Sequence, residues 1–185
     1  MIRGDRKGDG GTQYGLRLWE NDDLVPRPDD VFQERLYCIR WVETLYDDEG
    51  KPYQRRYYKA PDADDWQREK KVLDLLQERF YEWQKKGFIP SRKIEIGEET
   101  TRLLRERGWT HWHHLFNPRQ LLLIGTFFAK ILTNFNKDTV YLLILIGRLT
   151  NWNSKLCRWL QTQGGGIGGG KETFYNQALN TVYNY

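Results

Sequence analysis

A glycine-rich stretch near the carboxyl end, QTQGGGIGGGKETF, has the residue types of a phosphate-binding loop. The P-loop template is G-x-x-x-x-G-K followed by Ser or Thr, and Gly165, Gly170 and Lys171 fit it. The next residue is Glu172, whose carboxylate lacks the hydroxyl that holds Mg²⁺ and would repel the phosphates. A P-loop also follows a strand, whereas the residues before this stretch predict a helix. We therefore interpret residues 163–171 as a flexible glycine-rich linker and disfavour the nucleotide-site alternative.

All three histidines, His111, His113 and His114, lie within the stretch THWHHLF, where metal binding is the first chemistry to consider. Zinc takes four ligands with space between them, but His113 and His114 are neighbours whose side chains point apart in most backbones. No cysteine or carboxylate stands nearby at ligand spacing. We predict that these imidazoles make polar contacts in a loop before a helix, without a metal. The sequence also has no G-x-S-x-G motif and no cysteine beside a histidine, so no catalytic residue is assigned.

The stretch GRLTNWNSKLCRW carries polar and basic residues at helical spacing. Its four polar members follow one another at intervals of three, four and three residues, which places them on one face of a helix. Such a face can bind phosphates, and an asparagine can contact a base edge. An amphipathic helix packed on a core is the compatible alternative. With two further basic residues, the candidate nucleic-acid-binding residues are Arg119, Arg148, Asn151, Lys155, Arg158 and Lys171.

The distribution of charge also favours an anionic partner. The net charge of the whole chain is +4. From Asn117 onward there are seven Lys or Arg residues and two acidic residues, so this part carries +5 and the preceding part −1. A basic segment with so few acids is typical of contact with nucleic acid. The alternative is an ordinary surface that contains lysine and arginine.

Length and composition limit the remaining classes. With 185 residues the chain has room for one domain, or for one domain with extended arms. The two cysteines, Cys38 and Cys157, form no C-x-x-C motif, which favours a reducing, intracellular setting. The polar start MIRGDRKGDGG is unlike a signal peptide. The most apolar stretch, TVYLLILIG, is far shorter than the ~20 residues of a membrane span. We expect a cytoplasmic protein without a membrane contact.

The first third of the chain predicts β structure. Residues 1–13 are polar and glycine-rich and predict a disordered arm. Residues 14–61 predict a small β region, beginning with YGLRLWE. Apolar and polar residues partly alternate over residues 36–45, DDEGKPY supplies a turn, and QRRYYK returns. This pattern predicts a β-hairpin or a small meander.

Residues 62–162 predict a helical region, which begins with a long amphipathic helix. Asp62 is the expected N-cap, acidic residues fill the first turn, and Gly87 is expected to stop the helix. The opposite face is almost entirely charged and should face solvent. The apolar face is expected to comprise Trp66, Leu73, Leu76, Phe80 and Trp83.

Three more helices are expected in this region. A short helix should end at Gly108. Another should start with Asn117 as its cap and Pro118 in its first turn, where the missing N–H costs nothing. A long helix should cover residues 140–162, and its apolar residues 142–146 should be buried on all sides.

These patterns together predict an α+β fold that is mostly helical, with an N-terminal β-hairpin or small meander followed by a helical subdomain. Residues 172–185 predict a last helix or helix–strand piece. We expect this C-terminal segment to be truncated.

Three stretches, LFNPRQLLLIGTFFAKI, YLLILIGRLTNWNSKLCRW and ETFYNQALNTVYNY, occur in this order along the chain. They resemble blocks of a bacterial and archaeal family of adenine-specific DNA methylases that carry an N-terminal domain of unknown function. The upstream stretch RRYYKAPDADDWQRE resembles the same family. The resemblance covers roughly residues 53–185, on motif matches of the usual kind. It implies that the chain corresponds to the region between the S-adenosylmethionine motif and the D-P-P-Y motif.

The family's methyl-donor motif, its D-P-P-Y catalytic motif and its cysteine zinc cluster have no counterpart in this sequence. The resemblance therefore implies a fragment or split subunit of a DNA adenine methyltransferase, which positions DNA or supports the catalytic core and is inactive alone. S-adenosylmethionine belongs to the complete family enzyme, and no cofactor is expected in this chain. DNA and a second chain carrying the catalytic motifs are the expected partners. The alternative is a structural protein-interaction module that docks on such a chain.

Overall fold

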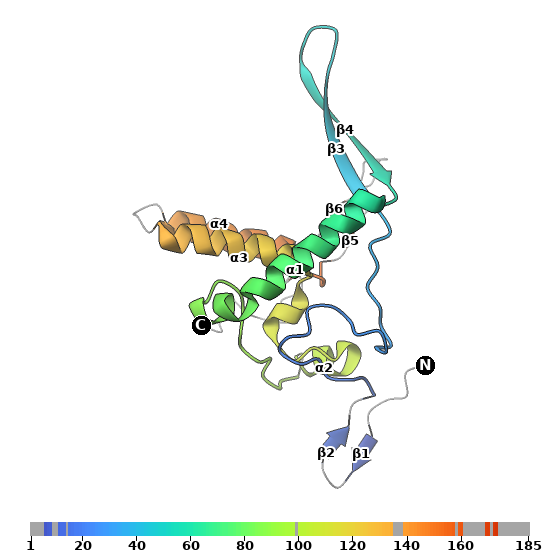
Figure 1. Ribbon diagram of the computed structural model, residues 1–185, viewed down its shortest axis with the longest axis vertical. Coiled ribbons are helices and arrows are strands. Elements are labelled where there is room, and N and C mark those ends of the chain that lie inside the picture. Colours follow the sequence, from blue (N-terminus) through green and yellow to red (C-terminus); the bar gives the residue numbers. More distant parts are fainter. Residues whose placement is uncertain are drawn as a thin grey trace.

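The fold is α+β and mostly helical, as the sequence predicts, with an antiparallel two-stranded hairpin followed by four α-helices. Figure 1 shows the hairpin projecting from the helical part, and two paired helices extending in a different direction. The core lies where the first long helix, the short helices and an irregular N-terminal segment meet. The computed structural model describes residues 6–8, 11–13, 15–98, 100–134, 139–157, 159–160, 169–170 and 172–173.

The N-terminal part differs from the sequence prediction in two ways. Strands β1 (Arg6–Gly8) and β2 (Gly11–Gln13) pair antiparallel within the segment predicted as a disordered arm. Backbone pairing needs no side-chain pattern, so the sequence carried no signal for it. Residues 15–38 contain no strand, although the sequence favoured β structure there.

Charge pairs, and not a strand ladder, hold residues 15–38 together. The Arg17 guanidinium donates two hydrogen bonds to Asp30, at 2.7 and 2.6 Å, and one to Asp23 at 2.6 Å. The hydrogen bonds from Arg17 keep the pKa of Asp30 below its usual range. Trp19 and Leu24 from the same segment are buried in the core. Bidentate arginine pairs of this kind fix a loop geometry that a hydrophobicity pattern does not reveal.

The predicted hairpin is present. Strand β3 (Ile39–Tyr46) pairs antiparallel with β4 (Pro52–Lys59), in a register that runs from Ile39 opposite Lys59 to Tyr46 opposite Pro52. In the turn, the Asp47 carboxylate accepts hydrogen bonds from the backbone N–H groups of Glu49 and Lys51, at 3.1 and 2.8 Å. Gly50 takes the left-handed conformation, with a φ of 78°, that a glycine adopts without strain. We call this hairpin the β ribbon.

Helix α1 (Ala63–Lys86) has the predicted ends. The side chain of Asp62 accepts from the N–H of Asp65 at 3.1 Å, and the side chain of Asp65 accepts from the N–H of Asp62 at 3.2 Å. Gly87 ends the helix in the left-handed conformation. Leu76, Phe80 and Trp83 of the predicted face are buried and Leu73 packs against them, whereas Trp66, in the first turn beyond the core, is 43% exposed.

The next two α-helices also have the end residues that the sequence predicts. Helix α2 (Thr101–Arg107) ends at Gly108, and the 3₁₀ helix η1 (Trp112–Leu115) precedes α3 (Pro118–Thr133). Asn117 caps α3: its side chain accepts from the N–H of Gln120 at 2.9 Å, and the Gln120 side chain accepts from the N–H of Asn117 at 3.0 Å. This reciprocal pair satisfies two backbone donors that a helix start otherwise leaves unpaired.

Helices α1 and α3 approach closely at Gly125. A Cβ atom at this position would lie 2.2 Å from the indole ring of Trp83 and 3.0 Å from Ile89. The crossing therefore requires a residue without a side chain. The core around it consists of Trp19, Leu24, Leu76, Phe80, Trp83, Phe88, Ile89, Ile94, Leu103, Trp109, Leu115, Phe116, Leu121 and Ile124.

Helix α4 (Thr139–Trp152) packs alongside α3 but is far less buried than predicted. Within residues 142–146, only Ile146 is buried, whereas Ile144 and Leu145 are 65% and 63% exposed. A helix that is apolar on all sides was expected to be enclosed. Among the described helices, α3 is the one that packs along α4, and the side of α4 that carries Ile144 and Leu145 remains exposed.

After α4, the described segments are short. Strand β5 (Trp159–Leu160) pairs antiparallel with β6 (Gly169–Gly170), which takes two residues of the predicted glycine-rich linker. The rest of that linker, and the segment predicted as a last helix apart from residues 172–173, lie outside the described residues. Across the part of the chain that the structure describes, no helix combines the length and apolar character needed to cross a membrane.

Candidate nucleic-acid interface

The predicted basic helical face does not form, because α4 ends at Trp152. Three residues later, the N–H of Lys155 donates to the carbonyl of Leu115 at 2.7 Å, a contact outside the helix. The side-chain amide of Asn153 donates to the carbonyl of Leu149 at 2.8 Å and so satisfies one of the last helical acceptors. The expectation that residues 140–162 form one helix is therefore wrong, and Lys155 does not share a helical face with Arg148.

The side chain of Lys155 is largely enclosed, and its ammonium group lies close to two tryptophans. Its Nζ is 5.0 Å from the centre of the Trp19 ring and 5.4 Å from that of Trp109. The same atom lies 2.6 Å from a carboxylate oxygen of Glu34, and the Lys155 side chain is only 10% exposed. A cation over an aromatic face is attracted by the ring quadrupole, more strongly when it is removed from water.

The positive charge of Lys155 therefore interacts with groups of the protein itself. Burial lowers the pKa of this lysine, and the nearby carboxylate of Glu34 opposes the shift. The contact with Glu34 is an ion pair outside hydrogen-bond geometry, and among the described residues Nζ has no hydrogen-bond partner. Three segments that are distant in sequence thus meet at one ammonium group. The enclosed cation does not favour the predicted contact of Lys155 with nucleic acid, which stays a prediction.

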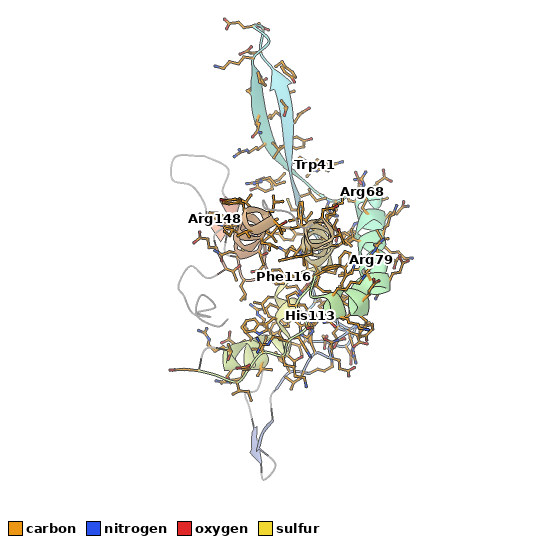
Figure 2. The ribbon with its side chains drawn as sticks, turned by 90° about the vertical axis from the view of Figure 1, so that its left-hand side faces the viewer. Trp41, Arg68, Arg79, His113, Phe116 and Arg148 are labelled. Carbon is orange, nitrogen blue, oxygen red and sulfur yellow. The ribbon has the colours of Figure 1, made fainter. Side chains whose placement is uncertain are left out.

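The other predicted residues are dispersed. Arg119 forms an ion pair with Glu69 of α1, and Arg148 lies 3.8 Å from Glu172 with its side chain 73% exposed. Figure 2 shows Arg148 on the flank of α4 away from α1. The backbone carbonyl of Asn151 accepts hydrogen bonds from the N–H and the hydroxyl of Thr173, both at 2.7 Å.

Arg158 and Lys171 lie outside the described residues. The residues chosen from the sequence are thus not brought into one site by the described part of the structure. Arg148 is the most exposed of those whose side chains are described.

The β ribbon combines basic and aromatic side chains on a projecting element. Figure 2 shows it standing away from the helices, with Trp41 at its root. Nearly all of its residues are exposed, and only Ile39 and Leu45 are half-buried. An isolated two-stranded hairpin is marginally stable in water. A ribbon that exposes five aromatic side chains therefore gains from a ligand that covers them.

Cross-strand pairs share a face, so the register divides the ribbon into two surfaces. We call the first the aromatic face; it contains the neighbours Trp41 and Tyr57 and the pair of Glu43 with Arg55. Its members are Ile39, Trp41, Glu43, Leu45, Tyr53, Arg55, Tyr57 and Lys59. We call the second the arginine face, and it contains Arg40, Val42, Thr44, Tyr46, Pro52, Gln54, Arg56 and Tyr58.

The two faces differ in charge and in internal contacts. On the aromatic face, the Arg55 side chain lies 4.0 Å from the carboxylate of Glu43 and 5.5 Å from the Tyr57 ring centre. Lys59, on the same face, pairs with Asp62 at 3.0 Å. The arginine face has two arginines and no acidic residue. There, the Arg56 guanidinium donates to the side-chain oxygen of Gln54 at 3.2 Å.

The ribbon was predicted as a hairpin but not as a site. The signal was present, because QRRYYK places two arginines among aromatic residues. The alternating apolar residues of the first strand suggested a face packed on the core, which would have left one surface to solvent. Both faces are exposed because the ribbon projects away from the helices.

The three histidines make polar contacts, as predicted, but they are buried, and His113 and His114 lie in the 3₁₀ helix and not in a loop. Nδ1 of His114 accepts from the N–H of Thr110 at 3.1 Å, and its Nε2 donates to the carbonyl of Glu20 at 3.0 Å. Burial lowers the pKa of His113 to about 4 and that of His114 to about 2. Their ring centres are 4.3 Å apart in an edge-to-face arrangement. In the described part of the chain, no group of three His, Cys, Asp or Glu side chains is arranged to hold a metal ion.

Comparison of the chain with protein-family models, with curated proteins and with solved structures finds no match.

Proposed function

We propose that the chain is a DNA-binding region of a DNA adenine methyltransferase, one that positions duplex DNA or supports the catalytic core. It carries no donor-binding or catalytic motif of its own. Those motifs would lie elsewhere, on the same polypeptide or on a partner chain. The sequence resemblance supports the enzyme class, and the β ribbon supports the DNA contact.

The observation that carries the DNA contact is the projecting, basic and aromatic β ribbon. Its two strands contain four basic residues and one acidic residue. Positive charges draw the protein to the phosphate backbone of the duplex. In the described part of the chain, most residues on both faces are exposed, so both faces are open to a ligand.

The test is the salt dependence of duplex DNA binding by the whole chain. The logarithm of the affinity falls with the logarithm of salt concentration by about 0.9 for each phosphate contact. Replacing Arg40, Arg55 and Arg56 with alanine should lower affinity and reduce this slope. The matched control replaces the exposed lysines Lys70, Lys71 and Lys85 of α1, which removes the same charge without changing the ribbon.

The outcomes separate clearly. A smaller slope in the ribbon variant and an unchanged slope in the α1 variant support the proposal. If both variants lose the same affinity, binding depends on net charge and the ribbon has no special role. If the wild-type chain fails to bind duplex DNA even at low salt, the DNA-binding proposal is rejected.

A second candidate function is a protein-interaction module, and the exposed apolar face of α3 and α4 favours it. Residues 139–147 of α4 contain no charged side chain, and Val140, Ile144 and Leu145 are more than half exposed. A groove of about 480 Å³ adjoins this face between α3, α4 and residues 87–92, and is lined mainly by apolar side chains such as Phe88 and Phe128. Contiguous apolar surface of this kind marks interaction sites in soluble proteins.

The occupant of that face would be the part of the enzyme that carries the donor and catalytic motifs. The resemblance implies that the present region lies between those two motifs, and we propose that the three parts pack together. Size-exclusion chromatography of the chain, alone and with a polypeptide carrying those motifs, tests this function. A stable complex that is lost in the Ile144→Gln, Leu145→Gln double variant supports docking. Co-elution that is unchanged by the double variant argues against this face.

A further inference from the structure

The two faces of the β ribbon are chemically unequal, and this inequality specifies how a duplex would lie. On the basis of the proposed DNA-binding function, we infer that the arginine face lies in the major groove of duplex DNA and the aromatic face turns away. The major groove of B-DNA is about 12 Å wide and admits a two-stranded β ribbon. The two strands of such a ribbon are about 4.8 Å apart.

Electrostatics favours the arginine face over its opposite. Every atom of DNA within reach in the groove is close to phosphates, so a carboxylate on the contacting face is repelled. Glu43 stands in the middle of the aromatic face, opposite Arg55. The arginine face presents Arg40 and Arg56 with no acid between them. These two arginines are diagonal neighbours, about 7–8 Å apart at the backbone, so both reach the same stretch of duplex.

The charge of the turn fixes which end of the ribbon contacts DNA. Asp47, Asp48 and Glu49 are consecutive at the tip, and Asp47 is held there by its hydrogen bonds within the turn. Three carboxylates at the tip disfavour insertion of the tip toward phosphates. The duplex therefore lies across the root and middle of the ribbon, where Arg40 and Arg56 are located, and the tip extends past the groove.

The pairing of Arg56 with Gln54 also gives the face a base preference. One lone pair of the Gln54 side-chain oxygen accepts from Arg56, and the Gln54 amide nitrogen stays a donor. The guanidinium has N–H donors and no acceptor, so the pair presents mainly donors. Guanine shows two acceptors, N7 and O6, at its major-groove edge, and an arginine that contacts both is the commonest specific contact. The pair should therefore favour guanine over adenine, which shows one acceptor and one donor.

The deciding experiment compares Arg56→Ala with Arg55→Ala. These neighbours on one strand carry the same charge, and both are exposed, but they point to opposite faces. Binding of the whole chain to a G·C-containing duplex is measured at one salt concentration, with circular dichroism as the folding control. We expect Arg56→Ala to weaken binding about tenfold and Arg55→Ala less than threefold.

A second measurement tests whether the chain contacts guanine in the major groove. Replacing guanine with 7-deazaguanine removes the N7 acceptor from the major-groove edge and leaves the base pair intact. The wild-type chain should lose affinity for the substituted duplex, whereas Arg56→Ala should bind both duplexes equally. Equal affinity of the wild-type chain for both duplexes overturns the guanine contact.

The failure of this inference is distinguishable from the failure of the proposed function. If the wild-type chain binds duplex DNA with a steep salt dependence but the two arginine variants lose equal affinity, or neither loses any, the face assignment is wrong and the DNA function stands. If the wild-type chain does not bind duplex DNA at low salt, the proposed function itself is wrong.

Discussion

The ammonium nitrogen of Lys155 lies 5.0 Å from the ring centre of Trp19, although the two residues come from opposite parts of the chain. Trp109 lies on the same cation at 5.4 Å, and Glu34 completes the enclosure. Lys155 thereby joins the segment after α4 to the N-terminal segment and to the residues after α2. The sequence predicts a DNA contact for this residue, whereas in the structure its side chain connects these segments of the fold.

We predict that Lys155→Ala destabilises the protein by about 2 kcal/mol, because it removes a desolvated cation–π contact and the packing of a buried aliphatic stem. Urea denaturation measures this loss. The matched control is Lys130→Ala on α3, whose exposed side chain should change stability by less than about 0.5 kcal/mol. DNA affinity of folded Lys155→Ala should equal that of the wild type. Full stability together with lost DNA binding would reverse our assignment of this lysine.

Stability should fall as the pH is lowered from 7 to 5. Burial holds the pKa of His113 at about 4 and that of His114 at about 2, below the unfolded value near 6.5. The unfolded chain therefore takes up protons first, and the stabilisation present above pH 6.5 is lost as the pH falls below it. The expected loss between pH 7 and pH 5 is about 2 kcal/mol for each histidine.

The control for this pH effect is His114→Gln, which cannot titrate. Its free energy of unfolding should depend on pH less steeply than that of the wild type, by about one proton in the window below pH 6. The carboxylates titrate mainly below this window, so they contribute little to the difference. A variant with an unchanged pH slope would show that the pKa of His114 is the same in the folded and the unfolded protein.

Gly125→Ala should be destabilising by about 1–3 kcal/mol, because the new methyl group would overlap the Trp83 ring at the α1–α3 crossing. Gly147 provides the control: it lies within α4, and a Cβ there meets no atom within 4 Å. Gly147→Ala should stabilise the helix by up to about 1 kcal/mol. The midpoints of thermal denaturation of the two variants should shift in opposite directions. Equal shifts would indicate that α1 and α3 do not approach closely at Gly125.

The exposed apolar side of α4 should make the isolated chain self-associate. Replacing Ile144 and Leu145 with glutamine removes two side chains that are 65% and 63% exposed. We expect this double variant to sediment as a smaller species than the wild type at the same concentration, with a stability change below about 1 kcal/mol. Identical sedimentation of the two proteins would indicate that this surface does not cause self-association.

Helix ends were predictable where their signals are local. Asp62 and Gly87 bound α1 through contacts within three or four residues, and Asn117 caps α3 in the same way. Such contacts depend on neighbouring residues only, so the sequence displays them directly. The hairpin turn at Asp47 is another local arrangement of this kind.

The candidate site was not predictable, because its determinants are distant contacts. Shortly after the end of α4, the backbone N–H of Lys155 donates a hydrogen bond to the carbonyl of Leu115, and the partners of the lysine cation come from two other segments. No periodicity encodes those partners. Likewise, the alternation in β3 identifies a strand but does not tell which neighbours cover it, so the exposure of both faces of the ribbon appears only in the assembled fold.

The β ribbon is attached at both ends to fixed points. Lys59, its last residue, pairs with Asp62, the cap of α1, so the returning strand leads into the helix within a few residues. On the other side, Glu34 is held at Lys155 shortly before β3 begins. Two short connections to the helical part limit how far the ribbon can change its direction relative to α1.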